Sequence, residues 1–490
     1  MSSIDDIRRF RIEKLEALRE RGIDPYPIES KRDATIQDVL SSWAKFSRKK
    51  GVTTLAGRVL AIRGQGGIIF FDIFDGTGKI QILLKKGEVE EEALSLFEEG
   101  VDIGDFVEAS GTFFTTKREE KTLQTASWGM LTKSLRPLPE KWHGLQDVEE
   151  KMRKRYLDLL SSQEVRERFY IRSKIISELR RLLDEEDFLE VETPILQPLA
   201  GGASAKPFKT HHHTLDTDLY LRIAPELYLK QLLIGGFPKV YEIGRSFRNE
   251  GIDVTHNPEF TMVEWYESFS DAKKQRVFVE KVLKAVVKKV IGKSSVSFGE
   301  ETIDFSKPFT VVSYAEVLKH HALIADISSL SREEAKLTAE RFGLKVEAGD
   351  STEKILDSIY KKSCRPKLIQ PTFIIDYPTE YLPLAKKHPG KKNLVDAFQV
   401  VIGGIEFVKA FSELNDPIDQ EERFLAQEKN KKAGDDEAQP NDREFVEALE
   451  YGMPPSAGLG LGIDRLAMLL TDSRNIRDVI FFPTLKPKKD

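Results

Sequence analysis

Two segments of the chain combine arginine with acidic, histidine or glycine residues in patterns that suit anion binding. Segment 244–269 (GRSFRNEGIDVTHNPEFTMVEWYESF) has the pattern of two β-runs around a polar turn that carries Arg248 and His256. Segment 458–470 (GLGLGIDRLAMLL) has the pattern of a glycine-bearing strand that enters a helix, with Arg465 at the junction. Because a planar guanidinium binds carboxylates and phosphates through two donors, both segments are candidates for holding such groups.

Three simpler motifs fail on spacing or geometry. The tripeptide GKS at 292–294 is not a phosphate-binding loop, because that motif needs a glycine where Val287 stands. The run GLGLGIDR at 458–465 lacks the spacing of a dinucleotide fingerprint, although its glycines indicate close backbone approach to a packed helix or a ligand. Neighbouring histidines at 211–213 would point to opposite faces of a strand, which disfavours a metal site.

Composition sets the class of protein. The chain has 490 residues with 75 basic and 80 acidic side chains, a net charge of −5, so an anionic partner must meet a local basic patch. No run of about 18 apolar residues is present, which excludes a membrane-spanning helix, and the N-terminus does not resemble a secretory signal. The single cysteine, Cys364, excludes an internal disulfide and fits a reducing, cytoplasmic compartment.

Changes in pattern along the chain predict its domains. We expect a helical extension at 1–50, an OB-type β-barrel at 51–135, a proline-containing linker at 136–150, and a second domain at 151–490 with an inserted segment at about 271–370.

Within the first parts, helical spacing of apolar residues predicts a helix over 4–21. This helix either docks on a neighbouring domain or serves as a charged helix ahead of a nucleic-acid-binding domain. The barrel is predicted from five short β-type runs separated by turn residues. Alternation along one of these runs puts Phe70 and Phe74 on the face opposite Phe71, so at least one of the three belongs to the barrel core. A phenylalanine left on the surface could stack on a nucleic-acid base.

The motifs together carry a family resemblance. With FLEVETPIL at 188–196, expected as a strand that ends at Pro194, the two arginine-bearing segments resemble the three signature motifs of class II aminoacyl-tRNA synthetases. Shorter strings are similar to those of bacterial-type lysyl-tRNA synthetases over nearly the whole chain: LRPLPEKWHGLQD, KRYLDLL, GGASAKPF, LRIAPELYLK, FSELNDP, AGDDEA and IRDVIFFP.

This resemblance implies an α+β fold, with a five-stranded OB barrel followed by a catalytic domain built on an antiparallel sheet flanked by helices. It implies ATP-dependent ligation of L-lysine to tRNA(Lys) through a lysyl-adenylate intermediate, with Mg²⁺ assisting. It also implies a cytoplasmic homodimer that pairs through the region of 188–196 and has no membrane association.

The resemblance implies a set of site residues. Those expected to contact ATP are Arg248, Glu250, His256, Asn257, Phe260, Glu406 and Arg465. Those expected to contact lysine are Gly202, Glu226, Arg248, Glu264, Tyr266, Lys409, Phe411 and Glu413. Arg248 and Arg465 are the expected catalytic residues, Glu406 is an expected magnesium ligand, and Phe70 and Gln81 are expected to contact the anticodon.

An acidic site suits a substrate with two ammonium groups. By the resemblance, Glu226 or Glu264 holds the α-ammonium, Gly202 gives backbone room, and Glu413 with Tyr266 meets the ε-ammonium. Leaving one charge of a buried pair unpaired costs ~3–5 kcal/mol, enough to reject a neutral isostere more than a hundredfold. Any one of these glutamates taken alone could be a surface or structural carboxylate.

Three positions depart from the family pattern. Gln399 stands where family members carry a glutamate that helps to bind magnesium, and Lys409 stands where they carry asparagine. A carboxylate-to-amide change weakens a hard-cation site, so Lys409 could take over part of the work of a divalent ion, unless its side chain points away. Ser127 replaces a glutamate of the barrel, so the middle anticodon base could be read less strictly.

Other functions fit these residues less well. A class II synthetase for aspartate or asparagine would need a basic site for the substrate side chain, whereas Glu413 and Tyr266 suit an ammonium. A paralogue that attaches lysine to a translation factor typically lacks the N-terminal barrel. A non-enzymatic OB-fold RNA-binding paralogue would have no reason to keep Arg248, Glu250, His256 and Arg465.

Overall fold

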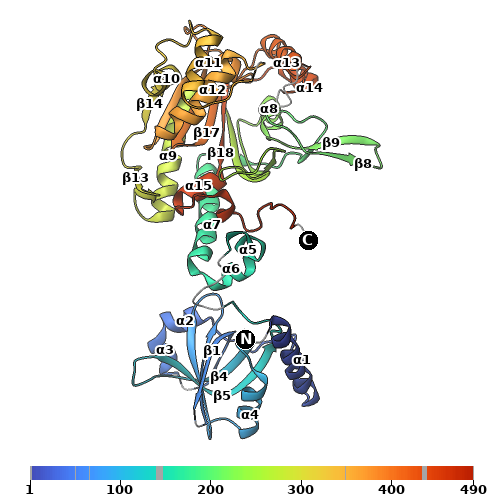
Figure 1. Cartoon of the computed structure of the whole chain (residues 1–490), viewed down its shortest axis with the longest axis vertical. Coiled ribbons are helices and arrows are strands. Elements are labelled where there is room, and N and C mark those ends of the chain that lie inside the picture. Colours follow the sequence, from blue (N-terminus) through green and yellow to red (C-terminus); the bar gives the residue numbers. More distant parts are fainter. Residues whose placement is uncertain are drawn as a thin grey trace. The chain divides into compact units, whose positions relative to one another are not determined.

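The computed structural model describes residues 3–49, 51–65, 67–139, 147–347, 349–432 and 439–488. The chain forms two compact units, Met1–Leu145 and Gln146–Asp490 (Figure 1). None of the helices in the described ranges is long and apolar enough to cross a bilayer. The finer domain boundaries given above stay predictions.

The first unit is built on a closed barrel whose strands follow the order β1-β2-β3-β5-β4. Its elements are α1 (Ile4–Glu20), α2 (Ile36–Ser41), α3 (Trp43–Ser47), β1 (Thr53–Gln65), β2 (Ile68–Phe74), β3 (Lys79–Lys85), α4 (Glu91–Gly100), β4 (Phe106–Thr115) and β5 (Lys121–Thr132). The pairing of β3 with β5 is parallel, and the other pairings that close the barrel are antiparallel. The five-stranded barrel predicted from the sequence is confirmed.

Strand β2 shows the predicted alternation. The side chain of Phe71 is fully buried in the barrel core, whereas Phe70 and Phe74 are half-buried on the other face. The prediction that at least one of the three phenylalanines belongs to the core is therefore confirmed.

Helix α1 docks on the barrel, as expected for a helix with one apolar stripe. Leu15 and Leu18 are buried, and Leu18 belongs to the same apolar core as the barrel strands. The contact is close at Gly100, the last residue of α4, where a Cβ would lie 2.9 Å from a methyl group of Leu18.

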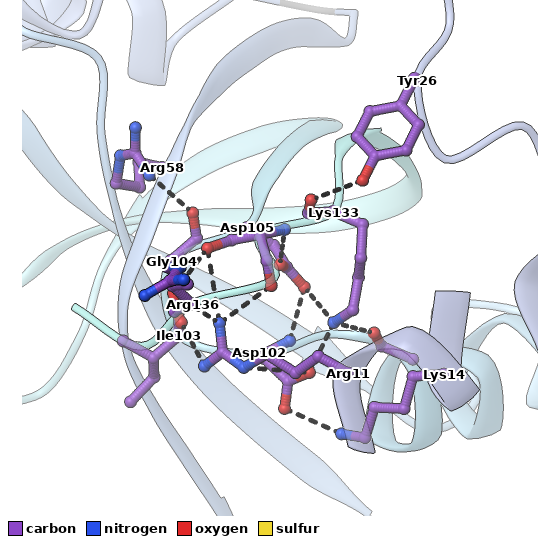
Figure 2. Close-up of polar contacts among 12 residues, drawn as sticks. Arg11, Lys14, Tyr26, Arg58, Asp102, Ile103, Gly104, Asp105, Lys133 and Arg136 are labelled. Carbon is purple, nitrogen blue, oxygen red and sulfur yellow. Dashed lines mark hydrogen bonds and ion pairs between the residues drawn. The ribbon is translucent and has the colours of Figure 1, made fainter. Parts of the chain in front are cut away.

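A buried ion network supports this docking (Figure 2). The ammonium of Lys133, just after β5, is fully buried and contacts the carboxylates of Asp102 and Asp105 at 2.5 and 2.8 Å. Lys14 of α1 pairs with the other oxygen of Asp102 at 2.8 Å, and Arg11 donates to the backbone oxygen of Ile103 at 2.9 Å. Each buried charge has a partner, which avoids the cost of burying one alone.

The second unit is built on an eight-stranded sheet in the order β14-β15-β16-β17-β18-β11-β10-β6. Its strands are β6 (Leu189–Glu190), β7 (Leu196–Gln197), β8 (Lys209–His212), β9 (Thr217–Leu221), β10 (Lys239–Phe247), β11 (Glu259–Ser268), β12 (Ser295–Phe298), β13 (Glu301–Asp304), β14 (Thr310–Ser313), β15 (Thr372–Pro378), β16 (Leu394–Ile402), β17 (Ile405–Ser412) and β18 (Ser456–Gly462). Its helices are α5 (Val148–Arg153), α6 (Arg155–Ser161), α7 (Gln163–Asp184), α8 (Glu226–Ile234), α9 (Ala272–Ile291), α10 (Tyr314–Ala322), α11 (Arg332–Arg341), α12 (Thr352–Ile359), α13 (Pro417–Lys432), α14 (Arg443–Glu450) and α15 (Ile463–Leu470). Short helical turns are η1 (Tyr360–Cys364), η2 (Arg365–Lys367), η3 (Thr379–Tyr381) and η4 (Ile476–Val479).

The predicted antiparallel sheet flanked by helices is confirmed, with parallel pairings only at β14–β15 and β10–β6 among the described strands of this sheet. One face of the sheet is buried by α7, α9 and α15 in a single apolar core. Val263 and Trp265 of β11 and Leu459 and Leu461 of β18 enter that core, so the residues between them point to the opposite face.

The strand predicted over 188–196 is wrong in its extent. Only Leu189–Glu190 pairs with β10, and the next paired residues, Leu196–Gln197, belong to a separate three-stranded sheet. Pro194 has no N–H for a sheet ladder and restricts the residue before it, which explains the interruption.

Candidate active site

Cross-strand register gathers the predicted site residues on the face of the sheet opposite α7, α9 and α15. Glu264 of β11 lies opposite Gly460 of β18, Gly460 lies opposite Lys409 of β17, and Lys409 lies opposite Gln399 of β16. Directly paired residues share a face, so these side chains form one row. The adjacent row runs through Tyr266, Gly458, Phe411 and Ala397 in the same way.

A β-bulge adds Glu406 to this face. Val401 pairs with Glu406 and Val400 pairs with Val408, so Phe407 is an extra residue in β17. Without the extra residue, Glu406 would lie on the face opposite Lys409, whereas the bulge restores the match. Phe407 and Val408 are accordingly buried in the same core although they are adjacent in sequence.

The alternating glycines of β18 make room for neighbouring side chains. A Cβ on Gly458 would lie 2.2 Å from the ring of Tyr266, and one on Gly460 would lie 2.9 Å from the terminal methyl of Met262. The close approach predicted from GLGLG is therefore real, and side chains of β11 make it. A residue larger than glycine at either position would displace the neighbouring side chain of β11.

At one end of this face lie the arginines. Arg465, at the start of α15, donates to the backbone oxygen of Glu406 at 2.8 Å, and its other nitrogen lies 3.3 Å from Nε2 of His256. The guanidinium of Arg248 lies 5.0 Å from the centre of the Phe260 ring. The two motif arginines are thus brought to the same site, with an aromatic surface beside them.

The turn between β10 and β11 positions the remaining predicted nucleotide contacts. The carboxylate of Asp253 accepts from Nδ1 of His256 at 2.9 Å, which orients the imidazole toward Arg465. Buried Asn257 donates to the backbone oxygen of Glu259 at 2.6 Å, so its amide braces the turn. Glu250 lies half-buried in the same turn.

At the other end of the face lies a buried acidic cluster. The carboxylates of Glu226, Glu264 and Glu413 are 6%, 4% and 1% exposed, and the hydroxyl of Tyr266 donates to Glu264 at 2.9 Å. Burial, together with the negative charge of Glu226, raises the pKa of Glu264 to about 8. Burial likewise raises the pKa of Glu413.

Lys230 is a component of this cluster that was not predicted. Its ammonium is fully buried, pairs with Glu226 at 2.6 Å and with Glu413, and lies 5.3 Å from the centre of the Phe411 ring. Burial alone would lower the pKa of Lys230, but the two carboxylates outweigh it and raise the pKa, so the side chain stays charged. The sequence signal was present, since Glu226 and Lys230 are four residues apart on α8.

Two further observations bear on the acidic end. The Oε1 atom of Glu413 is buried and has no hydrogen-bond partner among the described residues. Gly202 has a φ of +87°, and a Cβ there would lie 3.0 Å from the Cβ of Glu226, so a glycine is required beside the cluster. A cavity of about 60 Å³ on the α8 side is lined by Gly201, Leu227 and Tyr228, but none of the predicted lysine contacts lines it.

The donors present do not fit a divalent ion held mainly by protein carboxylates. Across the described ranges no three acidic, histidine or cysteine side chains come together in a metal-binding group. Glu406 is the one carboxylate among the predicted nucleotide contacts on β16 and β17, because position 399 is glutamine. A single carboxylate suits Mg²⁺ only where phosphates and waters supply the other ligands.

In the barrel, the two predicted anticodon contacts lie on neighbouring strands. Phe70 of β2 is half-buried and lies opposite Arg63 of β1, while Gln81 of β3 lies opposite Asp72 of β2. The side-chain oxygen of Gln81 accepts from Thr122 at 3.0 Å, which fixes the orientation of its amide. Phe70 and Asp72 share a face, so an aromatic surface lies beside polar groups.

Comparison with known proteins then decides the family. The family described as tRNA synthetases class II (D, K and N) matches residues 147–486, and the OB-fold nucleic acid binding domain matches residues 53–131. The lysine–tRNA ligase of Pelotomaculum thermopropionicum is 47% identical over 99% of this chain and 96% of the relative. The chain belongs to the class II lysine–tRNA ligases. Enzymes of the same name from Roseiflexus sp. and Carboxydothermus hydrogenoformans are 47% and 45% identical, each over 99% of both chains.

The two family matches identify which known domain each unit corresponds to. The barrel corresponds to the nucleic-acid-binding module, and the sheet that carries the two rows corresponds to the synthetase domain. Lysine–tRNA ligases use ATP, which accounts for a site that combines arginines with a cluster of carboxylates.

Proposed function

We propose that this protein ligates L-lysine to tRNA(Lys) in two steps on the face described above. In the first step the carboxylate of lysine attacks the α-phosphorus of ATP, so that lysyl-adenylate forms and pyrophosphate leaves. In the second step a hydroxyl of the terminal ribose of tRNA attacks the acyl carbon and AMP leaves. The observation that carries the proposal is the buried acidic cluster on the same sheet face as Arg248 and Arg465.

The acidic cluster matches lysine in charge. Three carboxylates and the ammonium of Lys230 leave two formal negative charges when all are ionised, and lysine brings two ammonium groups. The unpartnered oxygen of Glu413 and the oxygen that Tyr266 contacts on Glu264 are available acceptors. We assign Glu413 and Tyr266 to the ε-ammonium, and Glu226 or Glu264 to the α-ammonium. Gly202 and Phe411 complete the walls.

The arginines position the reacting groups, and the reaction needs no side-chain nucleophile because the substrate carboxylate is the nucleophile. Arg248 bridges the lysine carboxylate and the α-phosphate, which opposes their mutual repulsion and stabilises charge in the transition state. Arg465 binds the γ-phosphate end. Phe260 stacks on the adenine, and the adenine and phosphates also meet other polar groups of the turn: Glu250, His256 and Asn257.

We propose one carboxylate contact for magnesium. Glu406 would contact an Mg²⁺ bound to the phosphates of ATP, and such an ion would neutralise part of the phosphate charge. Lys409, which lies opposite Gln399 on the same face, is assigned to the region where the lysine carboxylate meets the phosphates of ATP.

The proposal extends to partners and location. The barrel binds the anticodon of tRNA(Lys) through Phe70 and Gln81, and the protein acts in the cytoplasm as a homodimer paired through the region of 188–196.

In Phe70→Ala, loss of one stacking contact is expected to weaken tRNA(Lys) binding by ~1–3 kcal/mol, with lysine activation unchanged. Transcripts varied at the middle anticodon base test whether Ser127 loosens discrimination, and gel filtration with light scattering tests the dimer.

The activity is tested by amino-acid-dependent exchange of pyrophosphate into ATP, measured over a panel of amino acids. We expect exchange with lysine and none above background with aspartate or asparagine, whose side chains would face carboxylates. Exchange that is absent for every amino acid would reject the enzymatic function and favour an RNA-binding role.

A further inference from the structure

The segment Tyr360–Lys367, formed by η1 and η2, brings additional cations to the carboxylate that was assigned to magnesium. Glu406 is half-buried and lies two residues after Gly404, which is in the turn between β16 and β17. This turn packs on the segment, because a Cβ on Gly404 would lie 2.9 Å from the backbone of Pro366 in η2. The segment carries Lys361 and Arg365, which belong to none of the motifs assigned above.

Gln399 is engaged in a way that removes it from metal binding. Its side-chain oxygen accepts from the hydroxyl of Tyr377 at 2.8 Å and from that of Tyr360 at 3.2 Å, and the residue is buried. The remaining amide group can only donate. Lys409 lies directly opposite on β17 and shares its face, so a divalent ion placed there would meet an ammonium rather than a ligand.

Arg365 has a buried hydrogen-bond donor that meets no acceptor among the described residues. This donor is its Nε atom, although the side chain as a whole is only half-buried. A buried guanidinium N–H without a partner is costly, so a ligand that accepts from it would be favoured. Lys361 is the outermost cation: it is half-exposed and pairs with Asp357 at 2.7 Å.

We propose that Lys361, Arg365 and Lys409 form a phosphate-binding subsite that holds the pyrophosphate end of ATP and supplies the positive charge that a divalent ion held by a second carboxylate would bring. The inference rests on the proposed function, because it assumes that ATP binds on this face. Around Glu406 and Asp357 the cations outnumber the carboxylates, since Arg248 and Arg465 also lie nearby. The surplus positive charge matches a polyphosphate. As pyrophosphate leaves, these fixed ammonium and guanidinium groups accept its growing charge.

The test measures binding of inorganic tripolyphosphate to the full-length protein by isothermal titration calorimetry in the presence of EDTA. The wild-type protein is compared with Lys409→Gln, Arg365→Gln and, as a matched control, Lys362→Gln, an exposed neighbour on η1. We expect the wild type to bind tripolyphosphate measurably without divalent ions. Each of the first two variants should bind it with an affinity at least about tenfold lower. The control should bind like the wild type. Thermal melting of each variant verifies that it is folded.

A second measurement follows magnesium directly. In the double variant Gln399→Glu with Lys409→Asn, the ratio of lysine-dependent exchange in saturating Mg²⁺ to exchange in EDTA should rise at least about tenfold, because a carboxylate pair binds the ion and the ammonium that stood in for it is gone. Wild-type binding of tripolyphosphate that disappears in EDTA, or folded variants that bind as tightly as the wild type, would overturn the subsite. Lysine-dependent exchange in excess Mg²⁺ separates this failure from failure of the proposed function, because that exchange would persist in the first case and be absent in the second.

Discussion

The acidic end and the cationic end of the same sheet face differ in the burial of their charged groups and in how these charges are balanced. At the acidic end the carboxylates are almost fully buried and the chain supplies its own counter-ion, Lys230. At the cationic end Lys409 is exposed, Arg465 is half-buried, and positive groups outnumber negative ones. The difference indicates that the first end selects a small cation by desolvation and fit, whereas the second neutralises a larger anion by excess charge.

This contrast follows from local structure. The acidic end is closed by α8, which brings Glu226 and Lys230 onto the sheet, and by the aromatic ring of Phe411. The cationic end depends on irregular backbone: the bulge at Phe407 turns Glu406 toward Lys409, and the η1–η2 segment adds Arg365. Regular secondary structure therefore forms the acidic end of the site, and departures from regularity shape the cationic end.

The largest expected effect separates the two ends kinetically. In Arg465→Ala the rate of lysine-dependent pyrophosphate exchange should fall about a hundredfold to a thousandfold, because a fixed positive charge at the phosphates is lost. The dissociation constant of lysine alone, measured by calorimetry, should stay near the wild-type value. A large loss of lysine affinity in this variant would show that the two ends are not separate.

The reciprocal change acts at the acidic end. In Glu413→Gln the affinity for lysine should fall more than about a hundredfold, because an ammonium in a buried site loses its charged partner. Binding of ATP in the absence of lysine should be unchanged. Glu450→Gln, at an exposed position on α14, serves as the control. Unaltered lysine affinity in Glu413→Gln would remove Glu413 from the site.

Lys230 tests whether the acidic end depends on its internal counter-ion. Lys230→Met leaves Glu226 and Glu413 without their buried cation, so the free energy of unfolding should drop by ~3–5 kcal/mol in urea titrations at neutral pH. The loss should shrink at acidic pH, where protonation neutralises the carboxylates. A variant as stable as the wild type would show that repulsion between the carboxylates of the cluster does not destabilise the protein.

A smaller effect concerns pH. Glu264, with a pKa of about 8 in the free protein, is mostly protonated near neutrality, whereas an ammonium ligand favours the ionised form. Lysine binding should therefore release a proton, and lysine affinity should increase as the pH rises toward 8, by at most about tenfold per pH unit for this group. Calorimetry in buffers of different ionisation enthalpy measures the release. Glu264→Gln should abolish it, and an equal release in that variant would assign the proton elsewhere.

Much of this architecture could be predicted from the sequence because it depends on short-range pattern. Alternation indicated that at least one of Phe70, Phe71 and Phe74 belongs to the barrel core, although not which one. The glycines of 458–462 indicated close backbone approach before any neighbour was known. Lys230 was missed although its spacing from Glu226 was visible, because its burial and its pairing with Glu413 depend on a distant part of the chain. Arg365 was missed because its position also depends on contacts between distant elements. The bulge at Phe407 was also missed, since nothing in the run IEFVKAF marks which residue is extra.

The most direct test of the central claim combines one substrate change with one protein change. Wild type and Glu413→Gln are each assayed by pyrophosphate exchange with lysine and with norleucine, which has the same carbon chain but no ε-ammonium. If the buried carboxylates select the dication, the wild type should prefer lysine more than about a hundredfold, and the preference should largely collapse in the variant. An equal preference for lysine in both proteins would contradict the account.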